Sequence, residues 1–350
     1  GAPNACQACH GNWSEQALLA HFEKRFGKEP LSSWAMVNHE AFQLNSLALL
    51  DIATIAQQAN IPPIRRASLL AQGVNFPSRL TLETLQSMLH DPEPLIRVAA
   101  AEAAGFLSAQ DRLAVLQTLI TDESKVVRMT VANELADTLP SAPAATLPKL
   151  HALFAEYENS LRLSEDMPGT QINLGTYYHR QGDLASARKA YQQALIIDPT
   201  FVPAMINLAD SYRASGDEVE AEKSLQRALV IAADSGAAQH ALGLLYVRRQ
   251  QLDRSLVHLK LATEQVDATP RFSYVYAVAL DSVNNRNAGI EVLVQAEKRW
   301  PNQPQNLMLL INYLDQQNRT MELLTHLSSL SRIMPGDPGV RALVAKYTNQ

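Results

Sequence analysis

The chain has 350 residues, of which 47% are hydrophobic, 19% charged and 6% aromatic, and its formal net charge is -5. This composition predicts an ordered, mostly helical protein and excludes a disordered chain. A membrane helix needs roughly 20 uninterrupted apolar residues, and no stretch reaches that length. The negative charge argues against a nucleic-acid-binding surface. At this length we expect two or three domains or one elongated array.

The first segment contains the sequence CQACH at positions 6–10, which includes both cysteines of the chain. C-x-x-C-H is the signature of covalent c-type haem attachment, in which two thiols add across the haem vinyl groups and the adjacent histidine binds the iron. Two intervening residues let both sulfurs reach one edge of the haem ring. We therefore expect haem c at Cys6 and Cys9, with His10 as an axial ligand of the iron.

Three other interpretations of the motif stay open. A thioredoxin-like dithiol needs a strand and a helix around it, whereas the local sequence predicts a loop followed by a helix. A zinc site needs four ligands, so His21 or His39 would have to complete it. The third interpretation is a pair of cysteines that carries no cofactor. His21, His39 and Met36 are also the nearby candidates for a sixth iron ligand, but an ordinary surface or core position is the simpler interpretation of each.

A period of 31 residues follows, and it indicates HEAT-like helical repeats. It aligns Arg66 with Arg97 and Arg128, and Asp91 with Asp122. An Asp in the turn and an Arg one turn into the next helix can form a ladder of ion pairs between stacked units. We assign these arginines a structural role, because contacts between neighbouring units stabilise a repeat array.

From Pro168 onward the sequence repeats every 34 residues, as the tetratricopeptide pattern does. The first unit carries eight residues of that pattern: Leu174, Gly175, Tyr178, Gly182, Ala187, Tyr191, Ala194 and Pro199. The register continues without a gap through five units of decreasing fidelity. Each unit is expected to form two antiparallel helices that meet through small residues, with Gly182 and Gly216 in the turns between them.

These patterns predict an all-α protein: an α-solenoid of HEAT-like helical repeats followed by a tetratricopeptide superhelix, with a short haem-motif segment in front of it. The predicted segments are residues 1–30 with the haem motif and the first helix, 31–140 with the HEAT-like repeats, 141–167 with a linker and a half-unit cap, and 168–350 with five tetratricopeptide units.

The first helices of tetratricopeptide units line a concave groove, where we expect a protein or peptide partner to bind. By their positions in the repeat, the groove candidates are Asn173, Arg180, Asn207, Asp210, Arg213, His240 and Tyr274. Asn173 and Asn207 occupy equivalent positions, and amides one repeat apart can hydrogen-bond a peptide backbone with little regard to its sequence. The basic residues that clamp a C-terminal carboxylate are missing, since Ala237 and Ala241 stand at two of their positions. The simpler alternative is an array that serves only as a spacer.

With the CQACH motif and its GAPNA flank, followed by two kinds of helical repeat, the chain resembles the bacterial multihaem c-type cytochromes that carry HEAT-like and tetratricopeptide repeats after their haem region. The phrase FVPAMINLADSYRASGDEVEAE, residues 201–222, is typical of their repeat portion. The resemblance covers nearly all of the chain. In that family further C-x-x-C-H motifs and an export signal lie upstream, so the resemblance implies the C-terminal portion of an exported, periplasmic protein.

The resemblance implies electron transfer through covalent haem c, with the tetratricopeptide groove docking a protein partner. The alternative function is a pure interaction scaffold whose haem motif is unoccupied. The sequence has no Gly-rich phosphate loop and no nucleophile elbow, so we do not expect enzyme activity in this chain. We expect no nucleic-acid partner and no membrane span, and the redox partner stays unidentified.

Overall fold

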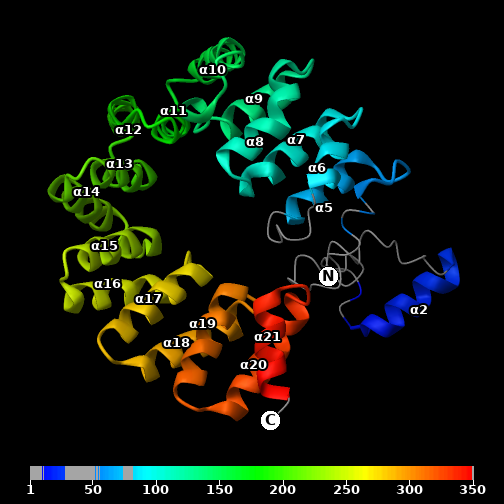
Figure 1. Ribbon diagram of the computed structural model, residues 1–350, viewed down its shortest axis with the longest axis vertical. Coiled ribbons are helices and arrows are strands. Elements are labelled where there is room, and N and C mark those ends of the chain that lie inside the picture. The colour runs from blue at the N-terminus through cyan, green and yellow to red at the C-terminus, as the bar shows by residue number, and fades with distance from the viewer. Residues whose placement is uncertain are drawn as a thin grey trace.

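The structure is a computed structural model that describes residues 10, 12–27, 52, 54, 56–73 and 82–348. Every regular element within these residues is helical. The helices follow one another in chain order around an arc that runs from α5 through α10 and α15 to α21 (Figure 1). The predicted all-α solenoid is therefore confirmed for the described part of the chain. No helix in this part is long and apolar enough to cross a membrane.

The HEAT region is built from short helices that pack through small side chains. The described helices up to this point are α2 (Glu15–Phe26), α5 (Pro63–Gly73), α6 (Leu82–Leu89), α7 (Pro94–Ala103), α8 (Ala109–Leu116) and α9 (Lys125–Glu134). Proline begins α5 and α7, where its missing N–H costs no helical hydrogen bond. Four alanines of α7 are buried, and small residues there let α5 and α9 pack closely on its two sides.

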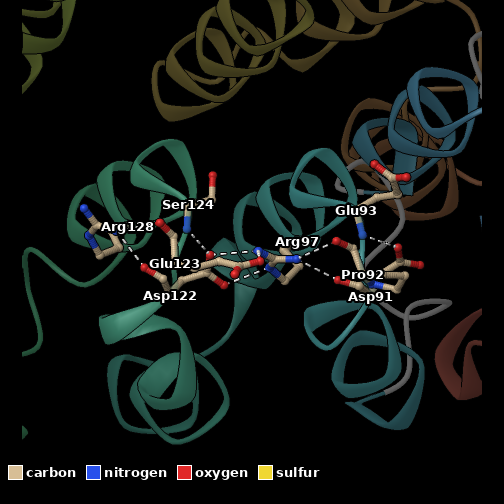
Figure 2. A network of polar contacts seen from close by, with 8 residues as sticks. All are labelled: Asp91, Pro92, Glu93, Arg97, Asp122, Glu123, Ser124 and Arg128. Atoms are coloured by element: carbon tan, nitrogen blue, oxygen red, sulfur yellow. Dashed lines mark hydrogen bonds and ion pairs between the residues drawn. The ribbon is translucent and has the colours of Figure 1, made fainter.

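Successive HEAT units are joined by the predicted ladder, and Arg97 makes its central rung (Figure 2). The Arg97 Nε and Nη2 atoms donate to the two carboxylate oxygens of Asp122, each at 2.8 Å. Its Nη1 atom donates to the carbonyl oxygens of Asp91 and Pro92, at 2.9 and 3.0 Å. The Arg97 and Asp122 side chains are each 7% exposed. The guanidinium therefore ties its own turn to the next unit, and the structural role is confirmed.

The rung after Arg97 repeats its two-point geometry with a glutamate as the acid, whereas the rung before it has a single hydrogen bond between the guanidinium and the carboxylate. Arg66 pairs with Asp91 before the central rung. Arg128 donates to both carboxylate oxygens of Glu156, at 2.9 and 2.6 Å. Glu156 belongs to α10, so the last rung attaches the HEAT array to the helix that follows it.

The helix α10 (Leu147–Arg162) joins the two arrays through one continuous core. Its Leu150, Leu153 and Phe154 side chains are buried in the same cluster as the HEAT helices. Tyr177 of the first tetratricopeptide helix is also part of this cluster, and its ring centroid lies 5.8 Å from that of Phe154. The segment predicted as a linker and half-unit cap therefore contributes core residues to both arrays.

Beyond this junction the helices form five antiparallel pairs and a final helix. They are α11 (Pro168–Arg180) with α12 (Leu184–Ile197), α13 (Val202–Ala214) with α14 (Glu218–Ile231), α15 (Gly236–Arg248) with α16 (Leu252–Glu264), α17 (Pro270–Ser282) with α18 (Arg286–Arg299), α19 (Pro304–Gln316) with α20 (Thr320–Ile333), and α21 (Pro338–Thr348). In the first pair, a Cβ atom on Gly175 would lie 2.3 Å from a ring carbon of Tyr191. Only glycine therefore allows this close approach of the two helices.

The turn inside each pair uses one residue with a left-handed backbone. The φ angle is positive at Gly182, Gly216, Gln250, Asn284 and Asn318, which lie 34 residues apart. In each turn the following N–H donates to a carbonyl five residues earlier, as Gln251 N does to Tyr246 O at 2.9 Å. Gly182 and Gly216 were predicted in these turns, and the prediction is confirmed. The later units keep the conformation without the glycine.

The first helices of the pairs form the inner row of the arc and the second helices the outer row (Figure 1). Consecutive first helices contact one another, as α11 does with α13, α13 with α15 and α17 with α19. The inner row is closer packed than the outer row, which curves the array around its first helices. Side chains that point away from the pair interfaces of the first helices therefore face the concave side.

Candidate functional site: the tetratricopeptide groove

A pocket of about 330 Å³ lies on the inner row between α13, α15 and α17. It is lined by Asn207, Asp210 and Arg213 of α13 and by His240 of α15, all of which the sequence predicted as groove residues. Helical spacing explains the α13 group, because residues three or four apart lie on one face of a helix. We call this cavity the groove pocket.

The α13 side of the pocket carries a charged pair at its surface. The Arg213 Nε atom donates to the Asp210 carboxylate at 2.7 Å, and this hydrogen bond raises the pKa of Arg213. The His179 Nε2 atom of the preceding unit lies 3.7 Å from the same carboxylate. Arg213 and Asp210 are both largely exposed. An exposed pair of this kind adds little to stability.

His240 is the unusual residue of the pocket, because it is buried and has no polar partner. Its relative exposure is 7%, and within the described residues neither ring nitrogen has a hydrogen-bond partner. The ring stacks on Phe272 of α17, with centroids 4.4 Å apart and an interplanar angle of 20°. Burial, with a smaller contribution from the positive charge of Arg271, lowers the pKa of His240 to about 4. The imidazole is therefore neutral at pH 7.

Two further arginines line the groove pocket, and sequence reasoning missed both. Arg248 at the end of α15 donates to both carboxylate oxygens of Glu218, at 2.7 and 3.1 Å. Arg271 lies in the first turn of α17 and is exposed. Its position in the repeat is that of Ala237 one unit earlier, which is one of the clamp positions. The 34-residue register, extended by one unit, therefore carries the signal for Arg271.

The remaining groove candidates lie elsewhere. Asn173 is exposed on α11 and Tyr274 is half-buried on α17, and neither lines the groove pocket. The Arg180 Nη2 atom donates to the carbonyl oxygen of Glu134 at 3.1 Å and lies 3.7 Å from the Asp137 carboxylate. Arg180 therefore connects the first tetratricopeptide helix to the HEAT array.

The haem motif lies largely outside the described residues, which include His10 but neither Cys6 nor Cys9. Met36 and His39 also lie outside them. The His10 side chain is exposed and its ring centroid is 5.0 Å from that of Trp13, which in turn contacts His21 edge-on at 4.9 Å. The described residues contain no group of three or more His, Cys, Asp or Glu side chains placed to hold a metal ion.

Comparisons with known proteins identify both kinds of repeat. The HEAT repeat model matches residues 51–136 and 82–164. Two tetratricopeptide repeat models match residues 155–200 and 178–245. The resemblance to multihaem cytochromes gains no support from these models. No curated protein matches the chain.

Among solved structures, similar chains include a MamA protein, at 18% identity and a TM-score of 0.40, covering 48% of this chain and 92% of that one. PilF of Pseudomonas aeruginosa is 15% identical with a TM-score of 0.42, covering 50% of this chain and 77% of that one. YrrB, described as a TPR protein with an unusual peptide-binding site, is 18% identical with a TM-score of 0.39, covering 54% of this chain and 96% of that one.

Proposed function

Because the chain is a repeat protein of HEAT and tetratricopeptide units, we propose that it is a protein-interaction scaffold whose inner row of helices binds a peptide segment of a partner protein. The observation that carries the proposal is the groove pocket, which gathers polar side chains from successive units on the concave side. Within the described residues, the Asn207 amide has no hydrogen-bond partner in the fold. It is therefore available to a peptide backbone.

In this function the HEAT array has a supporting role. In the ladder, the Arg97 guanidinium and the Asp122 carboxylate satisfy each other's hydrogen bonds. The last rung and the core around Tyr177 attach the array to the tetratricopeptide units. We therefore assign the HEAT region the task of holding the groove in place.

The test is a selection of binders from a random peptide library on the purified chain, followed by affinity measurements on the selected peptides by fluorescence anisotropy. We expect Asn173→Ala combined with Asn207→Ala to weaken binding by about tenfold, which corresponds to about 1.4 kcal/mol for lost backbone hydrogen bonds. Asn287→Ala is the matched control, because Asn287 is exposed on the second helix α18. Affinities unchanged in the double variant would remove the groove assignment.

We also propose that the CQACH motif carries covalent haem c when the chain matures in an exporting bacterium, and that the protein then works in the periplasm. The motif itself and the exposed imidazole of His10 support this proposal. A haem bound there would supply one-electron transfer, while Cys6 and Cys9 would hold it and His10 would bind the iron. A pyridine haemochrome spectrum of the chain isolated from such a periplasm tests it. Cys6→Ser combined with Cys9→Ser should abolish the spectrum, and absence of covalent haem in the unaltered chain contradicts the proposal.

A further inference from the structure

The groove pocket is more positive than the protein around it. Three guanidinium groups line it, from Arg213, Arg248 and Arg271, against the single carboxylate of Asp210. Arg213 is occupied by Asp210 and Arg248 by Glu218. Arg271 has no ion-pair partner in the part of the chain that the structure describes. In a chain with a net charge of -5, this local excess of positive charge favours an anionic ligand.

His240 provides a second and independent indication of a ligand. It lines the same pocket, is more than nine-tenths buried, and both of its ring nitrogens lack a partner. A buried donor or acceptor that is left unsatisfied destabilises the fold, so such a group calls for an explanation. In its neutral form the ring has one N–H, which can donate to an acceptor that enters the pocket.

The rest of the pocket is apolar and limits what fits. Ile206 and Leu244 line it beside Phe272, whose ring already stacks on His240. A cavity of about 330 Å³ has room for one or two side chains and none for a folded domain. The inner row of helices continues on both sides of the pocket, from α11 to α19 (Figure 1), so a bound chain can pass through it in both directions.

We propose that the groove pocket binds an acidic side chain within an internal peptide segment, with Arg271 pairing with the carboxylate, His240 donating a hydrogen bond to it, and a neighbouring apolar side chain resting on Phe272. This inference rests on the proposed function and specifies the class of its partner. A free C-terminal carboxylate is the less suitable source, because Ala237 and Ala241 stand where a terminal clamp needs polar or basic residues.

The test uses nine-residue peptides with acetylated and amidated ends, in which leucine flanks a central Asp, Glu, Asn, Gln or Lys. At low salt we expect the Asp or Glu peptides to bind about tenfold or more tightly than their amide counterparts, as hydrogen bonds to a charged group do. Arg271→Gln should abolish this preference. Arg341→Gln is the matched control, because Arg341 is exposed on α21, outside the pocket, and loses the same charge.

A second variant tests His240 through two readouts that move in opposite directions. His240→Leu removes a buried polar group without a partner, so the unliganded protein should melt at a higher temperature. The same variant should bind the acidic peptides several-fold more weakly, with little change for the amide peptides. A higher melting temperature with unchanged preference for the acidic peptides would overturn the role of His240.

The outcomes separate this inference from the proposed function. Equal binding of acidic and amide peptides, or a preference that survives Arg271→Gln, refutes the acidic-residue inference and leaves the peptide groove standing. Tighter binding of the same peptides with a free C-terminus shows that the pocket takes terminal carboxylates, which also refutes it. If none of the peptides binds and the library selection yields none, the proposed function itself fails.

Discussion

At the scale of single residues, the turn within each tetratricopeptide pair keeps the same backbone conformation although the residue type at that position changes. Five turns have a left-handed residue at the same repeat position, yet only the first two have glycine there. Asparagine tolerates this conformation better than other non-glycine residues, and it occupies two of the remaining turns. Gln250 is the exception, with a φ of 58° and a full side chain.

We therefore expect Gln250→Gly to stabilise the protein by about 0.5–1 kcal/mol, because relief of left-handed strain outweighs the greater freedom of glycine in the unfolded chain. The measurement is the midpoint of urea unfolding. Asn284→Gly is the control and should change the midpoint less. A lower midpoint for Gln250→Gly would show that its side chain contributes contacts worth more than the strain.

His240 gives the protein a specific dependence of stability on pH. Its folded pKa of about 4 lies below the ordinary histidine value of 6.5 because of burial and the nearby Arg271. Between those two values the unfolded chain binds a proton that the folded chain does not, so stability is fully present above pH 6.5 and falls as the pH drops toward 4. A depression of this size corresponds to about 3 kcal/mol.

The expected result is that the melting temperature of the wild-type protein falls more steeply from pH 7 to pH 4.5 than that of His240→Leu. His258 and His326 also have pKa values lowered by burial and contribute in the same direction, so both proteins should lose some stability. Only the difference between the two curves belongs to His240. Parallel curves would mean that the pKa of His240 is the same in the folded and the unfolded chain.

At the scale of elements, the ladder explains why the HEAT region was predictable from so short a pattern. Each rung needs an arginine and an acid at fixed positions, so the 31-residue period shows them directly. The last rung was missed because α10, which follows a different repeat, supplies Glu156 in place of the expected Asp. Contacts between units of the same repeat are thus visible in the sequence, whereas contacts between two kinds of repeat are not.

We expect Arg97→Met to destabilise the protein by about 3 kcal/mol, because it leaves the buried Asp122 carboxylate and two carbonyl groups without their partner. Chemical denaturation followed by circular dichroism measures the loss. Arg128→Met should cost less, because the Arg128 and Glu156 side chains are more exposed than those of the central rung. Equal losses in the two variants would mean that burial does not determine the strength of a rung.

In the groove, too, some residues could be predicted from the sequence and some contacts could not. Asn207, Asp210, Arg213 and His240 follow from the 34-residue register, and the structure brings them into one pocket. Arg180 also fits that register, but its side chain donates a hydrogen bond to the neighbouring HEAT array and does not line the pocket. The pairing of Arg248 with Glu218 and the stacking of Phe272 on His240 depend on packing between units, which no single unit specifies.

At the scale of the whole molecule, the HEAT array and the first tetratricopeptide helix share one hydrophobic core. The cluster that contains the HEAT helices runs through α10 to Tyr177, whereas the last helices of the chain have a core of their own around Leu327. In a repeat array a local change spreads mainly to adjacent units. The junction should therefore couple the HEAT region to the first tetratricopeptide unit.

We expect Phe154→Ala, a loss of about 3 kcal/mol of packing, to speed amide hydrogen exchange in both α9 and α11. Leu327→Ala is the matched control, and it should speed exchange in α19 to α21 without affecting α9. Mass spectrometry of protease fragments resolves these regions. Faster exchange on one side of α10 alone would show that the arrays open independently in spite of their common core.

The shared core at α10 also has a mechanical meaning. Two arrays joined by a flexible tether would let a bound partner drift relative to whatever the HEAT helices touch. Here the last rung of the ladder, the Arg180 contacts and the buried face of α10 all hold the two arrays together at the junction. A displacement of the HEAT helices relative to the first tetratricopeptide helix would therefore have to break these contacts.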